Sequence, residues 1–199
     1  MNFLKKILDF VMDILETITF VASIFIVIYL FIMQPNQVKG ASMEPALHSG
    51  EYIFTSKITY KFRSIERGDI IVFKSPQNPD IDYIKRVIGL PGDRVVIKNE
   101  TVSVNGLPLN EPYISTQTTL WEGGYIKEGK SVIVPEGELL VLGDNRPRSS
   151  DSREFGTIPI SSIIGQVFYR YFPPSKMGGF ENPLPKNLRA FSQKLHYLP

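Results

Sequence analysis

The sequence predicts a mainly β protein, in which an antiparallel β-sandwich or barrel-like domain follows one N-terminal transmembrane helix. Three observations support this fold class. A long hydrophobic segment without charges lies near the N-terminus. After residue 39, short β-preferring runs alternate with turn signals. No long amphipathic helix stands between these runs, which disfavours βαβ winding and favours antiparallel pairing.

The hydrophobic segment has the properties of a retained membrane anchor. No charged residue occurs between Thr17 and Val38, and residues 18–33 are its most apolar part. A membrane helix needs about 17–25 such residues. Residues 34–38 contain no small-x-small cleavage site, which disfavours a cleaved signal sequence, and a buried core helix is rarely apolar on every side. We therefore assign residues 1–38 to the anchor segment.

The residues before the anchor predict its orientation. Lys5 and Lys6 precede it, so the positive-inside rule favours a cytoplasmic N-terminus and an extracytoplasmic domain. Apolar side chains in residues 3–15 recur at helical spacing. They predict a helix that extends the anchor along or above the interface, and a helix that binds a partner is the alternative.

The strand-like runs and turn signals in the rest of the chain predict one β domain over residues 39–175. Asn105-Gly106, between alternating apolar residues, is a strong hairpin signal. Residues 94–137 are expected to form a hairpin-rich insert, and residues 176–199 a loosely ordered tail. Strand-like runs occur at residues 52–54, 70–73, 83–88, 95–97, 102–104, 107–109, 131–134, 138–142 and 163–171.

Composition excludes several classes of function. The net charge of +2 is too close to neutral to favour nucleic acid. The chain has no cysteine, so disulfides, thiolate zinc sites and cysteine nucleophiles are excluded. Two histidines, His48 and His196, are too few for a histidine-based metal site. We expect neither a metal nor a cofactor.

Ser42 is a candidate nucleophile, in the segment Gly40-Ala41-Ser42-Met43-Glu44-Pro45. A serine hydroxyl needs a nearby base to take its proton. His48 is six residues away, in a turn-like segment expected to face solvent, and His196 lies in the tail. A serine–histidine–aspartate triad is therefore disfavoured, because it requires an ordered histidine.

Lys85 is the other candidate base. A lysine acts as a base only when it is neutral, which requires burial to lower its pKa. The bulky residues around it in the run 83–88 suit a half-buried strand. The alternative is a solvent-facing lysine paired with Asp82 or Asp93, and lysines are rarely buried.

A polar segment at residues 143–153 follows an apolar strand and is dense in hydroxyls and opposite charges. It is either a solvated loop with surface ion pairs or a shell that orients the base by hydrogen bonds. Composition alone does not decide between the two.

Together these segments resemble bacterial type I signal peptidases, also called leader peptidases. The resemblance runs from the anchor to about Phe172. It implies a membrane-anchored serine endopeptidase that removes N-terminal signal peptides from exported preproteins after small-x-small sites. The motifs that carry it are Gly-Ala-Ser-Met-Glu-Pro at 40–45, Arg-Gly-Asp-Ile-Ile-Val-Phe at 67–73, Tyr-Ile-Lys-Arg-Val-Ile-Gly-Leu-Pro-Gly-Asp at 83–93, Gly-Asp-Asn-Arg at 143–146 and Ser-Ser-Asp-Ser-Arg at 149–153.

The resemblance implies a role for each matching residue. Ser42 is the nucleophile, Lys85 the general base, and Ser149 the hydroxyl that bonds the lysine amine. The Ser42 N–H and the Gly40 position form the oxyanion hole. The catalytic support shell comprises Arg86, Gly143, Asp144, Asp151 and Arg153. Shallow pockets for small substrate side chains are lined by Val38, Met43, Leu47, Tyr83 and Ile84.

The chain departs from the family pattern at a few positions. Some members carry a serine at the position of Gly40, and its hydroxyl assists the oxyanion. Losing such a donor can cost roughly 3–4 kcal/mol in a site that relies on it, so the donor is either absent here or replaced by backbone or water. Pro147 and Arg148 are less typical of their loop. Lysine rather than histidine at position 85 indicates the bacterial branch.

The resemblance also implies partners and location. Exported preproteins and the lipid bilayer are the expected partners, the secretion translocon is a further candidate, and we expect a monomer that binds no nucleic acid. The expected location is the plasma membrane, single-pass, with the thylakoid membrane as an alternative. Two other functions stay open. A self-cleaving repressor would need a DNA-binding module, and a catalytically silent β-scaffold would lack Ser42 or Lys85.

Overall fold

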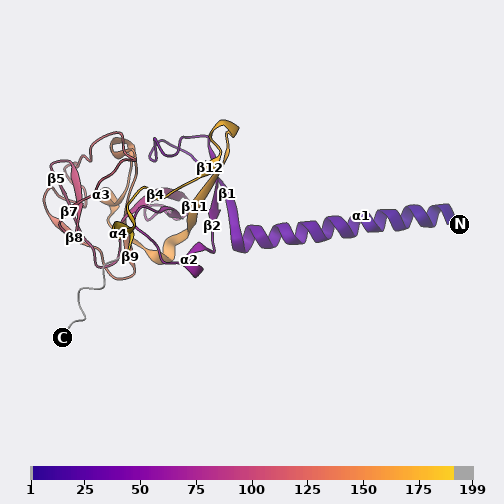
Figure 1. Ribbon diagram of the computed structural model, residues 1–199. Coiled ribbons are helices and arrows are strands. Elements are labelled where there is room, and N and C mark those ends of the chain that lie inside the picture. Colours follow the sequence, from indigo (N-terminus) through magenta and orange to yellow (C-terminus); the bar gives the residue numbers. More distant parts are fainter. Residues whose placement is uncertain (1, 191–199) are drawn as a thin grey trace.

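One long helix projects from the end of a β domain in the computed structural model, which describes residues 2–190 (Figure 1). This helix, α1 (Asn2–Val27), widens into a π-helical segment, η1 (Ile28–Ile32). The span Phe3–Ile32 is long and apolar enough to cross a membrane, and none of its most apolar window is buried. The helix is therefore compatible with the predicted anchor.

The larger sheet contains eight strands, and all of its pairs are antiparallel. Its order is β1-β2-β11-β3-β4-β9-β10, with β12 on β11. The strands are β1 (Met33–Gln37), β2 (Tyr52–Ser56), β3 (Ile70–Lys74), β4 (Asp82–Gly89), β9 (Glu138–Leu142), β10 (Ile158–Pro159), β11 (Ile163–Phe172) and β12 (Gly178–Gly179). This curled sheet confirms the mainly β, antiparallel class that the sequence predicts.

The sheet begins earlier than the sequence indicates. β1 lies inside the segment 1–38 that we assigned to the anchor, because its residues pair with β2 from Met33↔Ser56 to Gln37↔Tyr52. The other helical segments are short and lie in the connections. They are α2 (Thr59–Phe62), η2 (Arg146–Arg148), α3 (Ser152–Phe155), η3 (Ile160–Ser162), η4 (Pro174–Lys176) and α4 (Lys186–Arg189).

A smaller sheet lies at the end of the domain farthest from α1 (Figure 1). It comprises β5 (Arg94–Lys98), β6 (Thr101–Val104), β7 (Leu107–Pro108) and β8 (Ser131–Ile133), in the order β7-β6-β5-β8. Asn105 and Gly106 form its predicted tight turn with φ of 53° and 82°, the left-handed conformation that such hairpins require. This sheet falls within the range expected for the insert.

Strands β4 and β9 contribute side chains to two hydrophobic clusters, so both of their faces are buried. Ile88 and Leu140 point into the core beneath the smaller sheet. The residues next to them in the sequence, Val87 and Val141, pack into a second cluster on the other face. Successive strand side chains point to opposite faces, so the end of β4 that follows Lys85 is enclosed from both sides.

The C-terminal segment packs on the domain, so the expectation of a loosely ordered tail is wrong up to residue 190. Leu184 is 1% exposed and lies in the core of the smaller sheet. The Arg67 amide donates to Arg189 O, and Arg67 Nε donates to Leu188 O, both at 2.8 Å. The remainder of the tail, with His196, lies outside the described residues.

We predict that Leu184→Ala destabilises the protein by about 2–5 kcal/mol, because it removes buried methyl groups and leaves a cavity. Chemical denaturation in detergent measures this change. Leu107→Ala is the matched control: Leu107 is 61% exposed, and its truncation should have little effect. Equal effects of the two substitutions would contradict the packing of the tail.

Candidate active site

Ser42 lies in the tight connection between β1 and β2. Met43 and Leu47, both fully buried, pin one side of this turn into the core. The Leu47 amide donates to Met43 O at 2.8 Å, and the Val38 amide donates to Glu51 O at 2.8 Å. Because the apolar neighbours hold the turn from below, Ser42 is half-buried and faces the opposite side.

Lys85 reaches Ser42 from β4. Its Nζ lies 2.9 Å from Ser42 Oγ and 3.1 Å from Ile84 O. The amine also lies 5.0 Å from the centroid of the Tyr83 ring. Lys85 is only 4% exposed. The structure therefore brings together two candidates that are far apart in the sequence.

The competing assignments do not fit the geometry. Asp82 pairs with Lys74 at 2.8 Å, and Asp93 pairs with Arg67 at 2.9 Å, so neither carboxylate pairs with Lys85. His48 Nδ1 lies 3.6 Å from Glu51 Oε1 and 3.4 Å from Lys176 Nζ. The histidine thus belongs to a polar cluster around Glu51.

Burial lowers the pKa of Lys85 from its ordinary value of 10.5 to about 8. Desolvation is the main cause, because it penalises the charged amine. The carboxylates of Asp151 and Asp144 oppose the shift, and the Arg153 guanidinium adds to it. About a tenth of the protein therefore holds a neutral amine at pH 7, far more than an ordinary lysine would.

Gly143 allows the polar loop after β9 to approach Ser42 closely. The Asn145 amide donates to Ser42 O at 3.0 Å, and the Gly143 amide donates to Asp151 Oδ2 at 3.0 Å. A Cβ atom at position 143 would overlap Ser42 O and Ser149 Oγ. Only glycine fits without a shift of one of these segments.

The polar loop contributes to two bidentate ion pairs. Arg86 Nε and Nη2 bind Asp144 at 2.8 and 2.6 Å, and Arg153 Nε and Nη2 bind Asp151 at 2.8 and 2.7 Å. All four side chains are buried, so this is an enclosed shell rather than a solvated loop. In residues 2–190 no cluster of three or more histidine or acidic side chains is arranged to hold a metal ion.

A third buried arginine was not among our candidates. Arg146 Nε donates to Gly143 O at 3.0 Å, and its other nitrogens bind the Glu111 carboxylate and Thr118 Oγ1. The sequence signal that could have marked Arg146 is its place in the Gly-Asp-Asn-Arg motif at 143–146. Its partners lie in the insert, 35 and 28 residues away, and no local signal in the sequence marks them.

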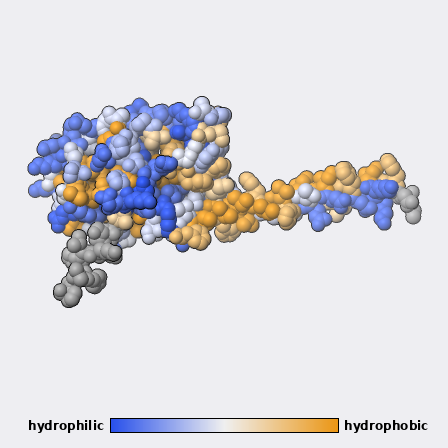
Figure 2. Space-filling model, viewed as in Figure 1, coloured by the Kyte–Doolittle hydropathy of each residue, from blue (hydrophilic) through white to orange (hydrophobic). Residues whose placement is uncertain are grey.

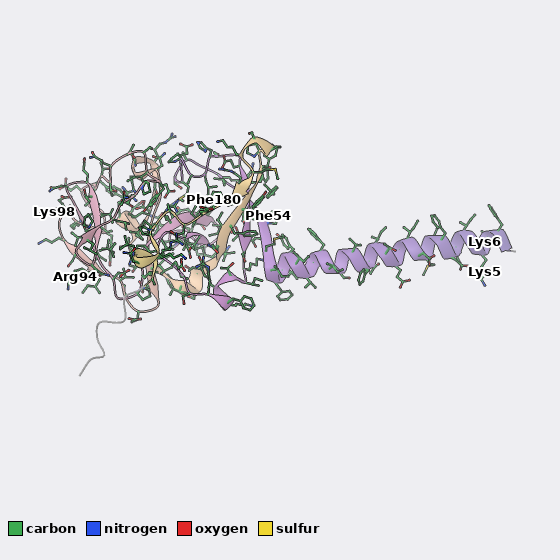
Figure 3. All side chains as sticks on the ribbon, viewed as in Figure 1. Lys5, Lys6, Phe54, Arg94, Lys98 and Phe180 are labelled. Carbon is green, nitrogen blue, oxygen red and sulfur yellow. The ribbon has the colours of Figure 1, made fainter. Side chains whose placement is uncertain are left out.

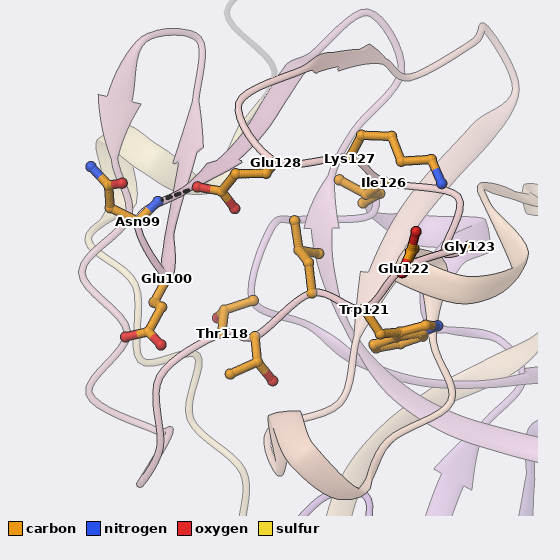
Figure 4. A pocket seen from close by; sticks show the side chains of 11 residues that line it. Asn99, Glu100, Thr118, Trp121, Glu122, Gly123, Ile126, Lys127 and Glu128 are labelled. Carbon is orange, nitrogen blue, oxygen red and sulfur yellow. Dashed lines mark hydrogen bonds between the residues drawn. The ribbon is translucent and has the colours of Figure 1, made fainter.

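The insert also supports Arg153 from behind. Arg153 Nη1 donates to Thr119 O at 2.8 Å, and its Cζ lies 5.2 Å from the Trp121 ring centroid. Thr119 and Trp121 belong to the wall of a hollow of about 530 Å³ on the insert (Figure 4). This hollow shares no lining residue with the groove at Ser42, so the insert meets the site through the arginines.

A groove of about 810 Å³ opens in front of Ser42 and Lys85. Of the expected pocket residues, four line it: Val38, Met43, Tyr83 and Ile84. Leu47 does not, because it is enclosed in the core beneath the Ser42 turn. Arg148 and Ser150 also line the groove, although neither was among our candidate residues.

Two strand edges border this groove. Residues 82–85 of β4 pair with β3 on one side, whereas the pairing of β4 with β9 begins only at Arg86. β1 is the terminal strand of its sheet and pairs only with β2. Residues 35–41 and 80–85 both line the groove, so unpaired backbone is available on either side of it.

One expected contact is not formed, and the amide at the Gly40 position binds another side chain. Ser149 Oγ is buried and has no hydrogen-bond partner in the described part of the chain, so it does not bond the Lys85 amine. The Gly40 amide donates to Ser49 Oγ at 3.3 Å. Gly40 has a φ of +89°, and a Cβ there would meet open space.

The comparisons identify the family. The model of the family described as "Signal peptidase, peptidase S26" matches residues 11–172. The chain belongs to this family. As a signal peptidase family member it is a serine endopeptidase of the class that processes signal peptides.

Two relatives agree with this assignment. Signal peptidase IB of Staphylococcus aureus (strain COL) is 40% identical over 185 residues, which cover 86% of this chain and 96% of that protein. Signal peptidase I of Bacillus caldolyticus is 43% identical over 152 residues, or 72% of this chain and 82% of that protein. The crystal structure of a signal peptidase I from Enterococcus faecalis V583 is 36% identical and covers 52% of this chain and 97% of that chain, with a TM-score of 0.44.

We predict that Lys85→Met stabilises the fold near pH 7 by about 3 kcal/mol, because it removes the cost of burying a charged amine. This cost corresponds to the fall in the pKa of Lys85 from 10.5 to about 8. Below pH 8 the lysine is protonated in both the folded and unfolded states, and the full cost applies. The cost fades as the pH rises to 10.5, so the difference between the proteins should vanish above that pH.

Denaturation curves from pH 6 to 11 measure this difference, and Lys98→Met on the exposed insert is the matched control. A Lys85→Met advantage that does not depend on pH would contradict the assigned cause.

Proposed function

We propose that this protein is a membrane-anchored endopeptidase that removes N-terminal signal peptides from exported preproteins, with Ser42 as nucleophile and Lys85 as general base. The observation that carries the proposal is the 2.9 Å contact between Lys85 Nζ and Ser42 Oγ, made by a lysine that is only 4% exposed. Family membership supports the reaction class. A catalytically silent scaffold has no need for a buried lysine at this cost.

The reaction proceeds through an acyl-enzyme. Neutral Lys85 takes the Ser42 proton while Oγ attacks the scissile carbonyl carbon, and an oxyanion forms. The ammonium then gives this proton to the leaving amine as the peptide bond breaks. Lys85, neutral again, takes a proton from a water that attacks the ester, and the carboxylic acid product leaves Ser42 with its proton restored.

The backbone N–H of Ser42 is proposed as one donor to the oxyanion. Within residues 2–190 it makes no hydrogen bond, and the bond from the Asn145 amide to Ser42 O holds the next peptide group, between Ser42 and Met43, in place. The Gly40 amide serves as the second donor only after it leaves Ser49 Oγ. Because Gly40 has no side chain, the backbone at this position must provide what a hydroxyl provides in other members.

The substrate is expected to bind as an added strand. The free backbone edges of residues 82–85 and of β1 border the groove and offer main-chain hydrogen bonds on both sides. Val38, Met43, Tyr83 and Ile84 line it and leave space for small side chains at the first and third positions before the cut. Leu47 acts from beneath, by supporting Met43.

The anchor is proposed to place this site at the outer face of the plasma membrane, with the thylakoid membrane as the alternative. Lys5 and Lys6 lie at the free end of α1 (Figure 3), which suits a cytoplasmic N-terminus. The apolar surface of α1 continues onto the adjoining side of the domain (Figure 2). Tyr52 of β2 and Phe172 of β11 are exposed, which supports contact with lipid. The translocon is a further candidate partner, and we expect a monomer.

We predict that Ser42→Ala abolishes cleavage of a synthetic preprotein with a small-x-small site, with kcat lowered by at least about 10³-fold. The full-length protein in lipid vesicles, assayed by gel for the processed product, measures this loss. Ser115→Ala, an exposed serine on the insert, should retain wild-type activity. Residual cleavage by Ser42→Ala near the wild-type rate would remove the whole assignment.

We predict that kcat/KM rises about tenfold per pH unit below pH 8 and levels off above it, because the free enzyme must lose the Lys85 proton before it reacts. Initial rates with a peptide that carries no titratable group, measured from pH 6 to 10, give this profile. A rate that is flat between pH 6 and 8 would contradict Lys85 as the base.

A further inference from the structure

Lys57, which directly follows β2, contacts the end of the long helix at its junction with the β domain. Its Nζ donates to Tyr29 O at 3.1 Å and to Leu30 O at 3.4 Å. Its amide donates to Ile32 O at 2.8 Å. One residue of the domain therefore binds three carbonyl groups at the end of the membrane helix.

These contacts provide hydrogen-bond donors for carbonyl groups at the end of the helix. The last carbonyls of a helix have no partner within it, and unsatisfied backbone is costly at the edge of a bilayer. The partial negative charge at this end also favours a cation. The Lys57 amine lies 5.4 Å from the Tyr29 ring centroid, a further favourable contact.

Lys57 and Tyr29 also mark the level of the membrane surface. A lysine ammonium avoids hydrocarbon, and tyrosine prefers the interface. The charge-free helical stretch that ends here runs from Thr17 to Ile32. At 1.5 Å per residue it spans about 24 Å, less than the hydrocarbon thickness of about 30 Å. So short a span leaves little freedom to slide along the membrane normal.

The link from this level to the nucleophile is rigid. η1 passes without a linker into β1, and Met33 pairs with Ser56, the residue before Lys57. β1 then leads directly into the Ser42 turn. The height of Ser42 above the bilayer therefore depends on how the helix end is fastened to β1 and β2.

We propose that Lys57 is a positioning residue that locks the anchor to the β1–β2 pair and sets the height of Ser42 above the membrane. The lock favours substrates held in the same bilayer over soluble peptides and fixes where along an extended substrate the cut falls. This role rests on the proposed function, in which membrane-held preproteins are cut.

The test compares full-length wild type, Lys57→Ala and Lys57→Arg in phosphatidylcholine–phosphatidylglycerol vesicles. Each is assayed with a preprotein inserted in the bilayer and with a soluble peptide that carries the same cleavage site. Lys57→Ala should lose about tenfold in kcat/KM on the preprotein, from the lost charge-assisted bonds, and change less than about twofold on the peptide. Lys57→Arg keeps donors for the same carbonyls and should restore cleavage. Lys61→Ala on the exposed face of α2 is the matched control.

A second readout measures height directly. The chain has no cysteine, so Thr116→Cys on the exposed insert accepts a single fluorophore. Energy transfer from this label to a dye on the lipid headgroups should report one narrow distance in wild type. The distance distribution should broaden in Lys57→Ala and narrow again in Lys57→Arg.

The outcomes separate the two hypotheses. Equal losses on both substrates, or unchanged preprotein cleavage with unchanged energy transfer, would overturn the positioning role. If wild type cuts neither substrate, the proposed function fails, while the energy-transfer measurement still decides whether Lys57 sets the height of the domain.

Discussion

The structure depends on keeping the Lys85 amine out of water and within reach of Ser42. Burial of the amine beside Ser42 and the Tyr83 ring supplies the desolvation that lowers the pKa of the lysine. The same burial makes the site costly for the fold, because a charged amine is unfavourable there. The domain accepts this cost where the chemistry needs a base, which is a recurrent trade between stability and activity.

The arrangement of the arginines follows from this constraint. Asp144 and Asp151 lie close enough to raise the pKa of Lys85, and unpaired carboxylates would keep it protonated. Arg86 and Arg153 bind them in bidentate pairs, so their negative charge is largely compensated. The ion-pair shell can thus hold the polar loop against Ser42 without removing the neutral amine.

The insert has a structural part in the site, although it is remote from the groove. Thr119 and Trp121 contact Arg153, and Glu111 and Thr118 hold Arg146. The smaller sheet therefore closes the shell from behind. At the other end of the domain, β1 connects the Ser42 turn to η1 and α1, so the candidate site lies between the smaller sheet and the long N-terminal helix (Figure 1).

Local physics in the sequence determined the antiparallel β class, the Asn105-Gly106 hairpin and an apolar helix near the N-terminus, because alternation, turn conformation and hydropathy involve neighbouring residues. Tertiary structure alone decided that β1 belongs to the sheet, that the segment around Leu184 is packed, and that Arg146 pairs with the insert. It also decided the state of Lys85, whose strand looks the same whether its amine faces solvent or a serine. Burial and long-range pairing depend on contacts between distant segments, and those contacts leave no pattern in the local sequence.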